Sequence, residues 1–224
     1  MLKVSKVFLR RNRQPEFRNL EELREKIIEG AQALFIQYGI RSVSMDDVAR
    51  TLSMSKKTLY QHFSNKNELV TDAVENYMKG EMAEFADIHD HASNAIEELY
   101  NLSKCMREHV FKINPSMLYD LQKYHADAWE IFNRFKNRFL RGQIVDNINK
   151  GIEEGNYRPD IDPRVIAVLR LETVQLAFND QIFPRSEFNF LEVQMQLFDH
   201  FVHGVLSDKG KQLYNDYQMK EVNS

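Results

Sequence analysis

The chain has 224 residues, enough for one large fold or two unequal ones, and its 43% hydrophobic and 28% charged residues are ordinary for a soluble globular protein. Its single cysteine, Cys105, excludes an internal disulfide and a thiolate metal site. No apolar run reaches about 18 residues and the first 13 are too basic for a secretory signal, so we expect a cytoplasmic protein without a membrane span.

The net charge of −3 is unevenly distributed along the chain. Residues 1–66 carry 13 Lys and Arg against 7 Asp and Glu, a net charge of +6, whereas residues 67–224 carry 17 against 26, a net charge of −9. A basic N-terminal third favours contact with a polyanion, although two parts of a chain can also differ in charge by chance.

The first predicted elements are one helix and two short ones. An apolar stripe at steps of three and four predicts a helix over residues 20–38, and Gly39 follows it where a left-handed cap belongs. Ser44 fits the N-cap of a short helix that buries Val48 and Ala49 and stops near Ser53. A second short helix is predicted from residue 55 or 56 to residue 62.

The rest of the chain is predicted to be helical as well. Asn65 fits the cap of a longer helix, another helix is expected over 93–112, and Asn114 followed by Pro115 predicts the start of a short one. One long helix is expected over 125–154. After a turn at 155–160, Asp162-Pro163 starts the next helix, and the last one covers roughly 189–207. We see no repeat and no strand, so the predicted fold class is all-α.

Two short helices with a short connection, preceded by a stabilising helix, predict a helix-turn-helix unit. A helix is about as wide as the roughly 12 Å major groove of B-DNA, so the second short helix could present side chains to base edges. Leu59 and Phe63 would anchor it. Its exposed face would consist of Lys56, Lys57, Thr58, Tyr60, Gln61 and His62. The alternative is a polar connecting helix with no such role.

The stretch from residue 26 to residue 73 resembles the TetR family of bacterial transcriptional regulators. The resemblance is carried by the segments at 44–49 (SMDDVA), 55–63 (SKKTLYQHF) and 66–69 (KNEL), about a fifth of the chain, with a weaker echo in EGNYR at 154–158. It implies a DNA-binding transcriptional regulator, by family default a repressor. The implied domains are a basic arm at 1–19, a helix-turn-helix domain at 20–66 and a helical effector-binding and dimerisation domain at 67–224.

Carried over by position, the resemblance implies a set of residues that contact a double-stranded DNA operator. Tyr60 and Lys66 match positions that usually contact phosphate, and Ser44 would offer its hydroxyl or amide to a phosphate. The full set is Ser44, Ser55, Lys56, Lys57, Thr58, Tyr60, Gln61, His62 and Lys66. Two positions depart from the family pattern, which often has Gly at Ser53 and Gly or Pro at Lys57. A left-handed serine would cost about 1 kcal/mol.

The arm at 1–19 is strongly basic, with Lys3, Lys6, Arg10, Arg11, Arg13 and Arg18 opposed only by Glu16. Such an arm could enter a minor groove, where the negative potential attracts arginine. The alternative is a tail that only raises non-specific affinity for DNA.

The two long helices that we predict last are apolar on more than one face, over 163–178 and 189–207, and therefore need cover on more than one side. A second subunit would provide that cover. The resemblance also implies a homodimer through a four-helix bundle of these two helices, which would set two recognition helices over a palindromic operator.

Aromatic residues are dense in the middle helices, and the resemblance implies a small-molecule effector in a cavity among them. The residues that we assign to this pocket are Phe85, Tyr119, Trp129, Phe132, Phe135 and Phe178. The alternative is that these aromatics are core residues only. The effector itself is not identified, and we expect no cofactor.

Two other functional classes remain open. An enzyme or metal site is suggested by His89 and His91 and by the pair His200 and His203, but no catalytic motif accompanies them, so we expect neither catalysis nor a bound metal. A helical lipid- or acyl-group-binding protein without a DNA role would keep the aromatic cavity, yet it gives no reason for the basic face from Lys56 to Lys66.

Overall fold

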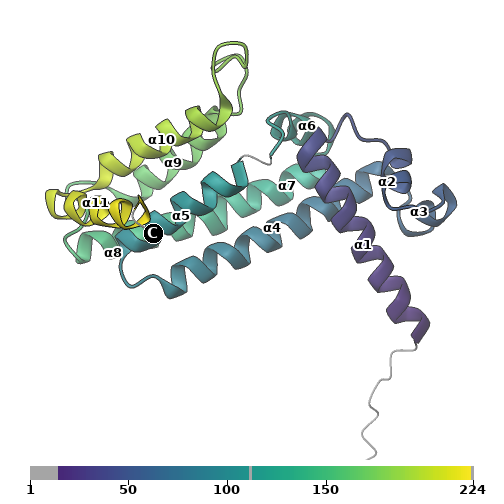
Figure 1. Ribbon diagram of the computed structural model, residues 1–224, viewed down its shortest axis with the longest axis horizontal. Helices are drawn as coiled ribbons and strands as arrows, with labels where there is room; N and C mark the ends of the chain where they lie inside the picture. The colour runs from purple at the N-terminus through teal and green to yellow at the C-terminus, as the bar shows by residue number, and fades with distance from the viewer. Residues whose placement is uncertain (1–14, 111–112, 223–224) are drawn as a thin grey trace, which may run out of the picture.

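The computed structural model describes residues 15–110 and 113–222, and every regular element in these two stretches is a helix, which confirms the predicted all-α fold. Three helices form a head at one end of an elongated molecule, and the others form a body (Figure 1). The head consists of α1 (Pro15–Tyr38), α2 (Met45–Thr51) and α3 (Lys56–His62), and α4 (Lys66–His91) runs from the head along the body.

The body places α5, α7 and α8 alongside α4, with α9 and α10 on the opposite side from α4 (Figure 1). Its remaining elements are α5 (Ala95–Val110), α6 (Met117–Tyr124), α7 (Ala126–Arg134), η1 (Phe135–Leu140), α8 (Arg141–Glu153), α9 (Pro163–Leu176), α10 (Phe190–Val205) and α11 (Asp208–Val222). The predicted long helix over 125–154 is confirmed, because α7, η1 and α8 follow one another without a break; η1 is a π-helical segment within it.

The caps that shape the head are those that the sequence predicts. Ser44 accepts a hydrogen bond from the amide of Asp47, whose carboxylate accepts one from the Ser44 amide at 2.9 Å, so the capping box of α2 is complete. Asn65 caps α4 by accepting the amide of Glu68 at 3.0 Å. Gly39 has a φ of 80° and Ser53 a φ of 53°, which confirms the left-handed turn at both positions.

Buried residues form two clusters. The first joins the head to the body, since Phe35, Leu59 and Phe63 of the head belong to the same cluster as Met117 and Leu121 of α6. The second lies deeper in the body and is built from α5, α8, α10 and α11. Because the head shares a core with α4, α6 and α7, a shift of these helices changes the packing under the head.

The turn between α8 and α9 is bonded to α5, to α8 and to Ser207, which precedes α11. The Glu154 carboxylate accepts a hydrogen bond from the amide of Ala95 at 3.0 Å. The Tyr157 hydroxyl lies within hydrogen-bond distance of two acceptors, the Ala95 carbonyl at 3.1 Å and the Asn147 amide oxygen at 2.9 Å. The Asn156 carbonyl accepts the amide of Ser207. The segment at 154–158 therefore has a structural role in this protein.

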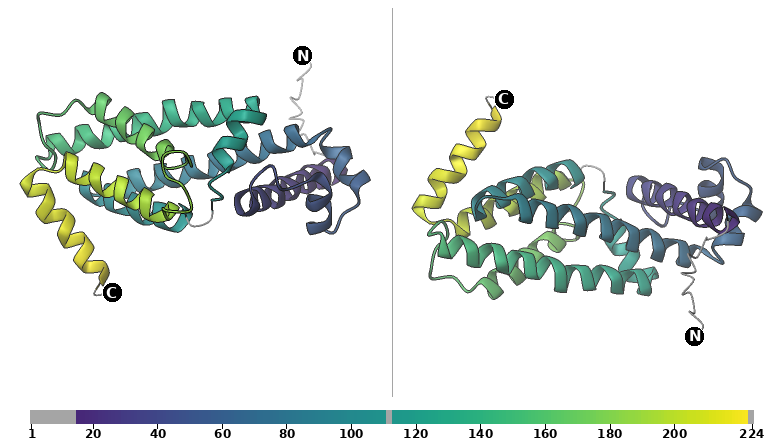
Figure 2. Two further views of the ribbon diagram at one scale, coloured as in Figure 1. Left: turned by 90° about the horizontal axis from the view of Figure 1, so that it is seen from above. Right: turned by 90° about the horizontal axis from the view of Figure 1, so that it is seen from below.

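The prediction that the chain's last helix ends near residue 207 is wrong, because α11 follows. Ser207 caps it by accepting the amide of Gly210 at 3.1 Å, and Tyr214 is buried in the second cluster. The helix packs against α5, at the end of the body opposite the head (Figure 2).

Three predicted helix boundaries also need correction. Helix α6 begins at Met117, because Asn114 and Pro115 form a turn in which the Asn114 side chain accepts the amide of Ser116. Helix α1 begins at Pro15, so residues 15–19 of the predicted arm are helical. Helix α9 ends at Leu176 and does not include residues 177 and 178. None of the described helices combines the length and the apolar character that crossing a membrane requires.

Candidate DNA-binding surface and ligand cavity

Helix α3 lies at the outer end of the head with one face in solvent (Figure 1). Leu59 and Phe63 are fully buried and fix the helix against the rest of the head. Tyr60 is 51% exposed although it is aromatic, and Gln61 is exposed beside it. The helix therefore presents polar and aromatic side chains to solvent, as a recognition helix does.

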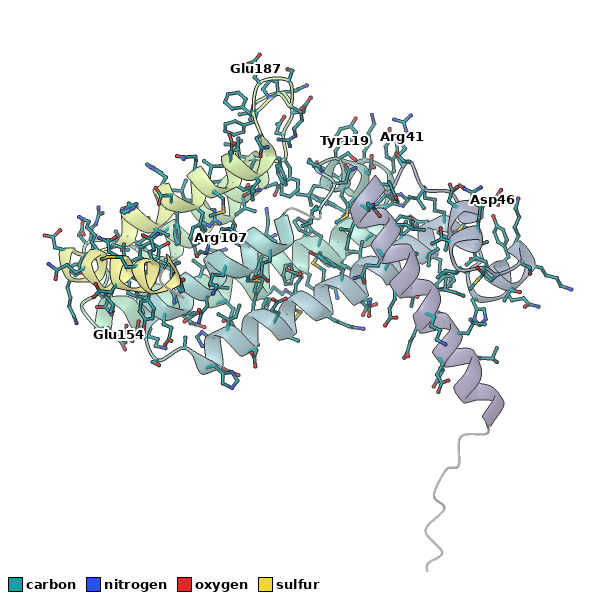
Figure 3. The ribbon with its side chains drawn as sticks, in the orientation of Figure 1. Arg41, Asp46, Arg107, Tyr119, Glu154 and Glu187 are labelled. Carbon is teal, nitrogen blue, oxygen red and sulfur yellow. The ribbon has the colours of Figure 1, made fainter. Side chains whose placement is uncertain are left out.

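The two lysines of α3 have different surroundings. The ammonium of Lys56 pairs with the Asp46 carboxylate of α2 at 2.5 Å, and Asp46 lies on the outer part of the head (Figure 3). Lys57 is exposed and has no ion-pair partner within the two described stretches. Lys57 is therefore the lysine of this helix that is free to meet a phosphate.

The other predicted contact residues either lie at helix starts or are half-buried within α3. Ser55 caps α3 and shares a hydrogen bond of 2.8 Å between its hydroxyl and that of Thr58. Thr58 and His62 are half-buried. The Ser44 hydroxyl donates to the Asp47 carboxylate at 2.6 Å. The Lys66 ammonium donates to the carbonyl of Ile40 at 2.6 Å, and partial burial lowers its pKa. Their contacts with DNA stay predictions.

The head and the body meet at α6. The amide of Arg41 donates to the buried Asp120 carboxylate at 3.1 Å, and the Asn114 amide donates to the carbonyl of Ile36 in α1 at 2.7 Å. Arg41 and Tyr119 lie close to this junction (Figure 3). These bonds link the backbone of the head to the segment that leads out of the body.

A cavity of about 220 Å³ lies inside the body, and we call it the inner cavity. Helices α4, α5, α8, α9 and α10 contribute to its wall, and none of its lining residues is exposed. Most of the wall is apolar. Its polar members include Glu98, Arg170 and Gln194, each of which is at least 95% buried. An apolar pocket with a few polar groups is the usual form of a small-molecule site.

A larger groove of about 980 Å³, the outer groove, lies between α6, α7 and α9. Its wall includes exposed residues, among them Leu169, Glu172 and Leu176 of α9. Exposed apolar residues on one face of a helix are a feature of an interface, so the size of this groove does not make it the better ligand site.

The six predicted effector residues do not come together in one cavity. Phe85 and Phe178 line the inner cavity, whereas Tyr119 and Trp129 line the outer groove, which Phe178 also reaches. The other two pack elsewhere: Phe132 stacks on Trp129, and Phe135 stacks on Phe85 and is buried in the first cluster.

Comparison with known proteins gives the family. Residues 27–73, which hold α2, α3 and the ends of α1 and α4 next to them, match the family described as "Bacterial regulatory proteins, tetR family". Residues 27–73 are therefore a TetR-family DNA-binding domain. The chain is a DNA-binding transcriptional regulator, and a binding protein without a DNA role is not favoured.

The relatives extend the TetR similarity into the body. The chain is 28% identical over 142 residues to the HTH-type transcriptional repressor KstR2 of Mycobacterium tuberculosis, covering 62% of this chain and 71% of the relative. It is 26% identical over 171 residues to the uncharacterized HTH-type transcriptional regulator YvaF of Bacillus subtilis, covering 75% and 88%.

Solved structures agree in fold. The structure of the ketosteroid transcriptional regulator KstR2 of M. tuberculosis matches with a TM-score of 0.57 and 25% identity, over 83% of this chain and 96% of that one. A transcriptional regulator of Saccharomonospora viridis, solved in complex with choline, matches with a TM-score of 0.69 and 18% identity, over 84% and 99%.

The polar wall of the inner cavity was not predicted from the sequence. Arg170 lies in a helix predicted to be apolar on more than one face, and a lone cation between Leu169 and Leu171 was a usable signal. Within the described stretches no group of three metal-ligating side chains is present. His89 pairs with Glu98 and His91 with Asp87, while His200 and His203 are exposed on α10.

Proposed function

We propose that this regulator is a repressor that binds a palindromic operator as a homodimer and responds to a small-molecule effector. The observation that carries the proposal is the solvent-exposed face of α3, where Lys57, Tyr60 and Gln61 are presented by the buried anchors Leu59 and Phe63. The name of the KstR2 relative, a transcriptional repressor, supports repression rather than activation.

The proposed dimer interface is an apolar stripe on α9. Val165, Val168, Leu169 and Leu176 recur at helical spacing and are 61%, 40%, 58% and 38% exposed. Exposed apolar residues in such a row are costly in a monomer and favour burial against a second copy. The outer groove shares Leu169 and Leu176 with this stripe, so we assign it to the same interface. A two-fold axis there would pair the two heads on DNA.

The proposed effector site is the inner cavity, and a short route leads from it to the head. Ile113 lines the cavity, and the next residue, Asn114, holds the Ile36 carbonyl of α1. Helix α4 contributes Tyr77 and Phe85 to the cavity and starts in the head. A ligand would reduce DNA affinity only if it prefers an arrangement of these segments in which the heads are wrongly spaced.

Alanine substitution of Lys57 and Tyr60 tests the DNA-binding surface. We expect the double variant to lose specific DNA binding while its far-UV circular dichroism stays that of the wild type, because both side chains are exposed. Lys211→Ala is the matched control, since Lys211 is an exposed lysine on α11. If the double variant binds DNA as tightly as this control, α3 is not the recognition helix.

A further inference from the structure

Arg170 of α9 is a buried cation in the wall of the inner cavity, and its hydrogen bonds are incomplete. Its residue exposure is 5%, and one of its guanidinium nitrogens, Nη1, is buried without any hydrogen-bond partner. The other, Nη2, donates only to the sulfur of Met106 at 3.3 Å, a weak acceptor. The guanidinium lies over the rings of Phe198 and Phe201, with its carbon 5.1 and 5.6 Å from their centroids.

No acidic residue in the described stretches neutralises Arg170, although the cavity wall contains carboxylates. Burial lowers the pKa of its guanidinium to about 10, which leaves it charged at neutral pH. A buried charge without a counter-charge is strongly unfavourable. Perturbed ionisable groups in cavities cluster at functional sites, and an anionic ligand would supply the partner that Arg170 lacks.

The carboxylates in the same wall already have partners. Glu98 shares a hydrogen bond of 2.9 Å with Nδ1 of His89, and Glu81 is hydrogen-bonded to the hydroxyl of Tyr77. The unpartnered oxygens in the wall, Oε2 of Glu98 and Oε1 of Gln194, are acceptors that a water or a ligand hydroxyl would satisfy. Neither carboxylate is bonded to Arg170, so its guanidinium keeps unused donors in the wall, and these donors favour an anionic group beside them over a cationic one.

The size and the lining of the cavity limit the rest of the ligand. The wall around Arg170 is apolar, with Leu102, Leu171, Val174 and Phe198 among its members. A cavity of about 150 Å³ holds benzene, so the 220 Å³ of the inner cavity correspond to roughly ten non-hydrogen atoms. Gln194 donates to the carbonyl of Val174, one turn along α9 from Arg170, so both polar groups lie at one side of the cavity.

We propose that the effector is an apolar monocarboxylate of about this size, whose carboxylate pairs with Arg170 and whose body fills the apolar part of the inner cavity. The planar guanidinium is suited to a carboxylate, because two of its N–H groups can donate to the two oxygens. This inference rests on the proposed function only in assigning the ligand a regulatory role; the binding itself is a separate claim.

The test compares acids with their neutral and cationic analogues on the full-length protein. Octanoate and phenylacetate are titrated by calorimetry, followed by octanamide, phenylacetamide and octylamine, which keep the apolar body and change the charge. We expect each acid to bind at least about tenfold more tightly than its amide, because the amide carries no charge to pair with Arg170. The amine should bind weakest.

Variants then test whether the preference for the acid over its amide depends on Arg170. Arg170→Met is expected to bind acid and amide equally, and Arg170→Lys to keep a reduced preference for the acid. Arg164→Met, the same change at an exposed arginine of α9, should leave the wild-type preference intact. The wild-type comparison needs no variant to fold, so it stands by itself.

Equal binding of acids and amides, a preference for the amine, no binding of either acid, or a preference that survives in Arg170→Met would each overturn the inference. A separate DNA-binding assay distinguishes failure of this inference from failure of the proposed function. Acids that bind but never release DNA would refute the effector role and leave the ligand class intact. A neutral compound that binds in the inner cavity and releases DNA would refute the ligand class and leave the effector role intact.

Discussion

Replacing Arg170 by methionine should make the ligand-free protein more stable. Methionine has a similar length and fills the same space, but it removes a charge that has no counter-charge in the described part of the chain. Burial lowers the pKa of Arg170 from 12.5 to about 10. That difference corresponds to an unfavourable contribution of about 3 kcal/mol to the folded state.

The direction of the pKa shift determines the sign of this contribution and the pH range over which it acts. The folded-state pKa of this base is lowered, so the penalty is fully present at every pH below about 10, and it declines only as the pH rises through that value. The contacts of the guanidinium with Phe198 and Phe201 offset part of it, by about 1–2 kcal/mol. We therefore expect Arg170→Met to raise the free energy of unfolding by about 1–2 kcal/mol at pH 7.

Urea unfolding followed by far-UV circular dichroism measures this change, at a fixed protein concentration because a dimer's stability depends on it. Arg164→Met on the same helix is the control, because it removes only an exposed ion pair with Asp162 and should change the midpoint little. A loss of about 3 kcal/mol or more in Arg170→Met would refute the reasoning, because such a loss is typical of breaking a buried ion pair.

Three further predictions concern the head and the dimer. Ser53→Gly should raise the free energy of unfolding by up to about 1 kcal/mol, because glycine adopts a φ of 53° without steric cost; a lower thermal midpoint would contradict this. Lys57→Ala should reduce the slope of log K against log salt by about 1.8 for a dimer, whereas an unchanged slope would show that Lys57 does not contact phosphate. Leu169→Glu should convert the dimer to a monomer in light scattering, while Met82→Glu, an exposed position on α4, should not; a dimeric Leu169→Glu would remove α9 from the interface.

The sequence predicted what depends on neighbours along the chain. The caps at Ser44 and Asn65 and the left-handed turn at Ser53 are confirmed, because each is decided by contacts within about four residues. The short helices of the head follow from these caps and from the anchors Leu59 and Phe63. The exposed face of α3 could be derived in the same way.

What the sequence could not provide depends on contacts between distant helices. An apolar position shows that a residue is buried but not against which neighbour. Of the six aromatic residues assigned to one pocket, four are therefore divided between two cavities and two line neither of them. Nothing near Arg170 in the chain shows that α5 and α10 surround it without a carboxylate partner. Helix α11 was missed because its sequence is mostly polar, and among its described side chains the second cluster includes only Leu213, Tyr214 and Tyr217.

Selection of bound sequences from a random pool of double-stranded DNA tests the central claim most directly. A homodimer that presents two copies of α3 about a two-fold axis should enrich a palindrome, with half-sites separated by about one helical turn or a multiple of it. The Lys57 and Tyr60 double-alanine variant should enrich nothing under the same conditions. Failure of the wild-type protein to enrich any sequence, or enrichment of one asymmetric site, would contradict the account.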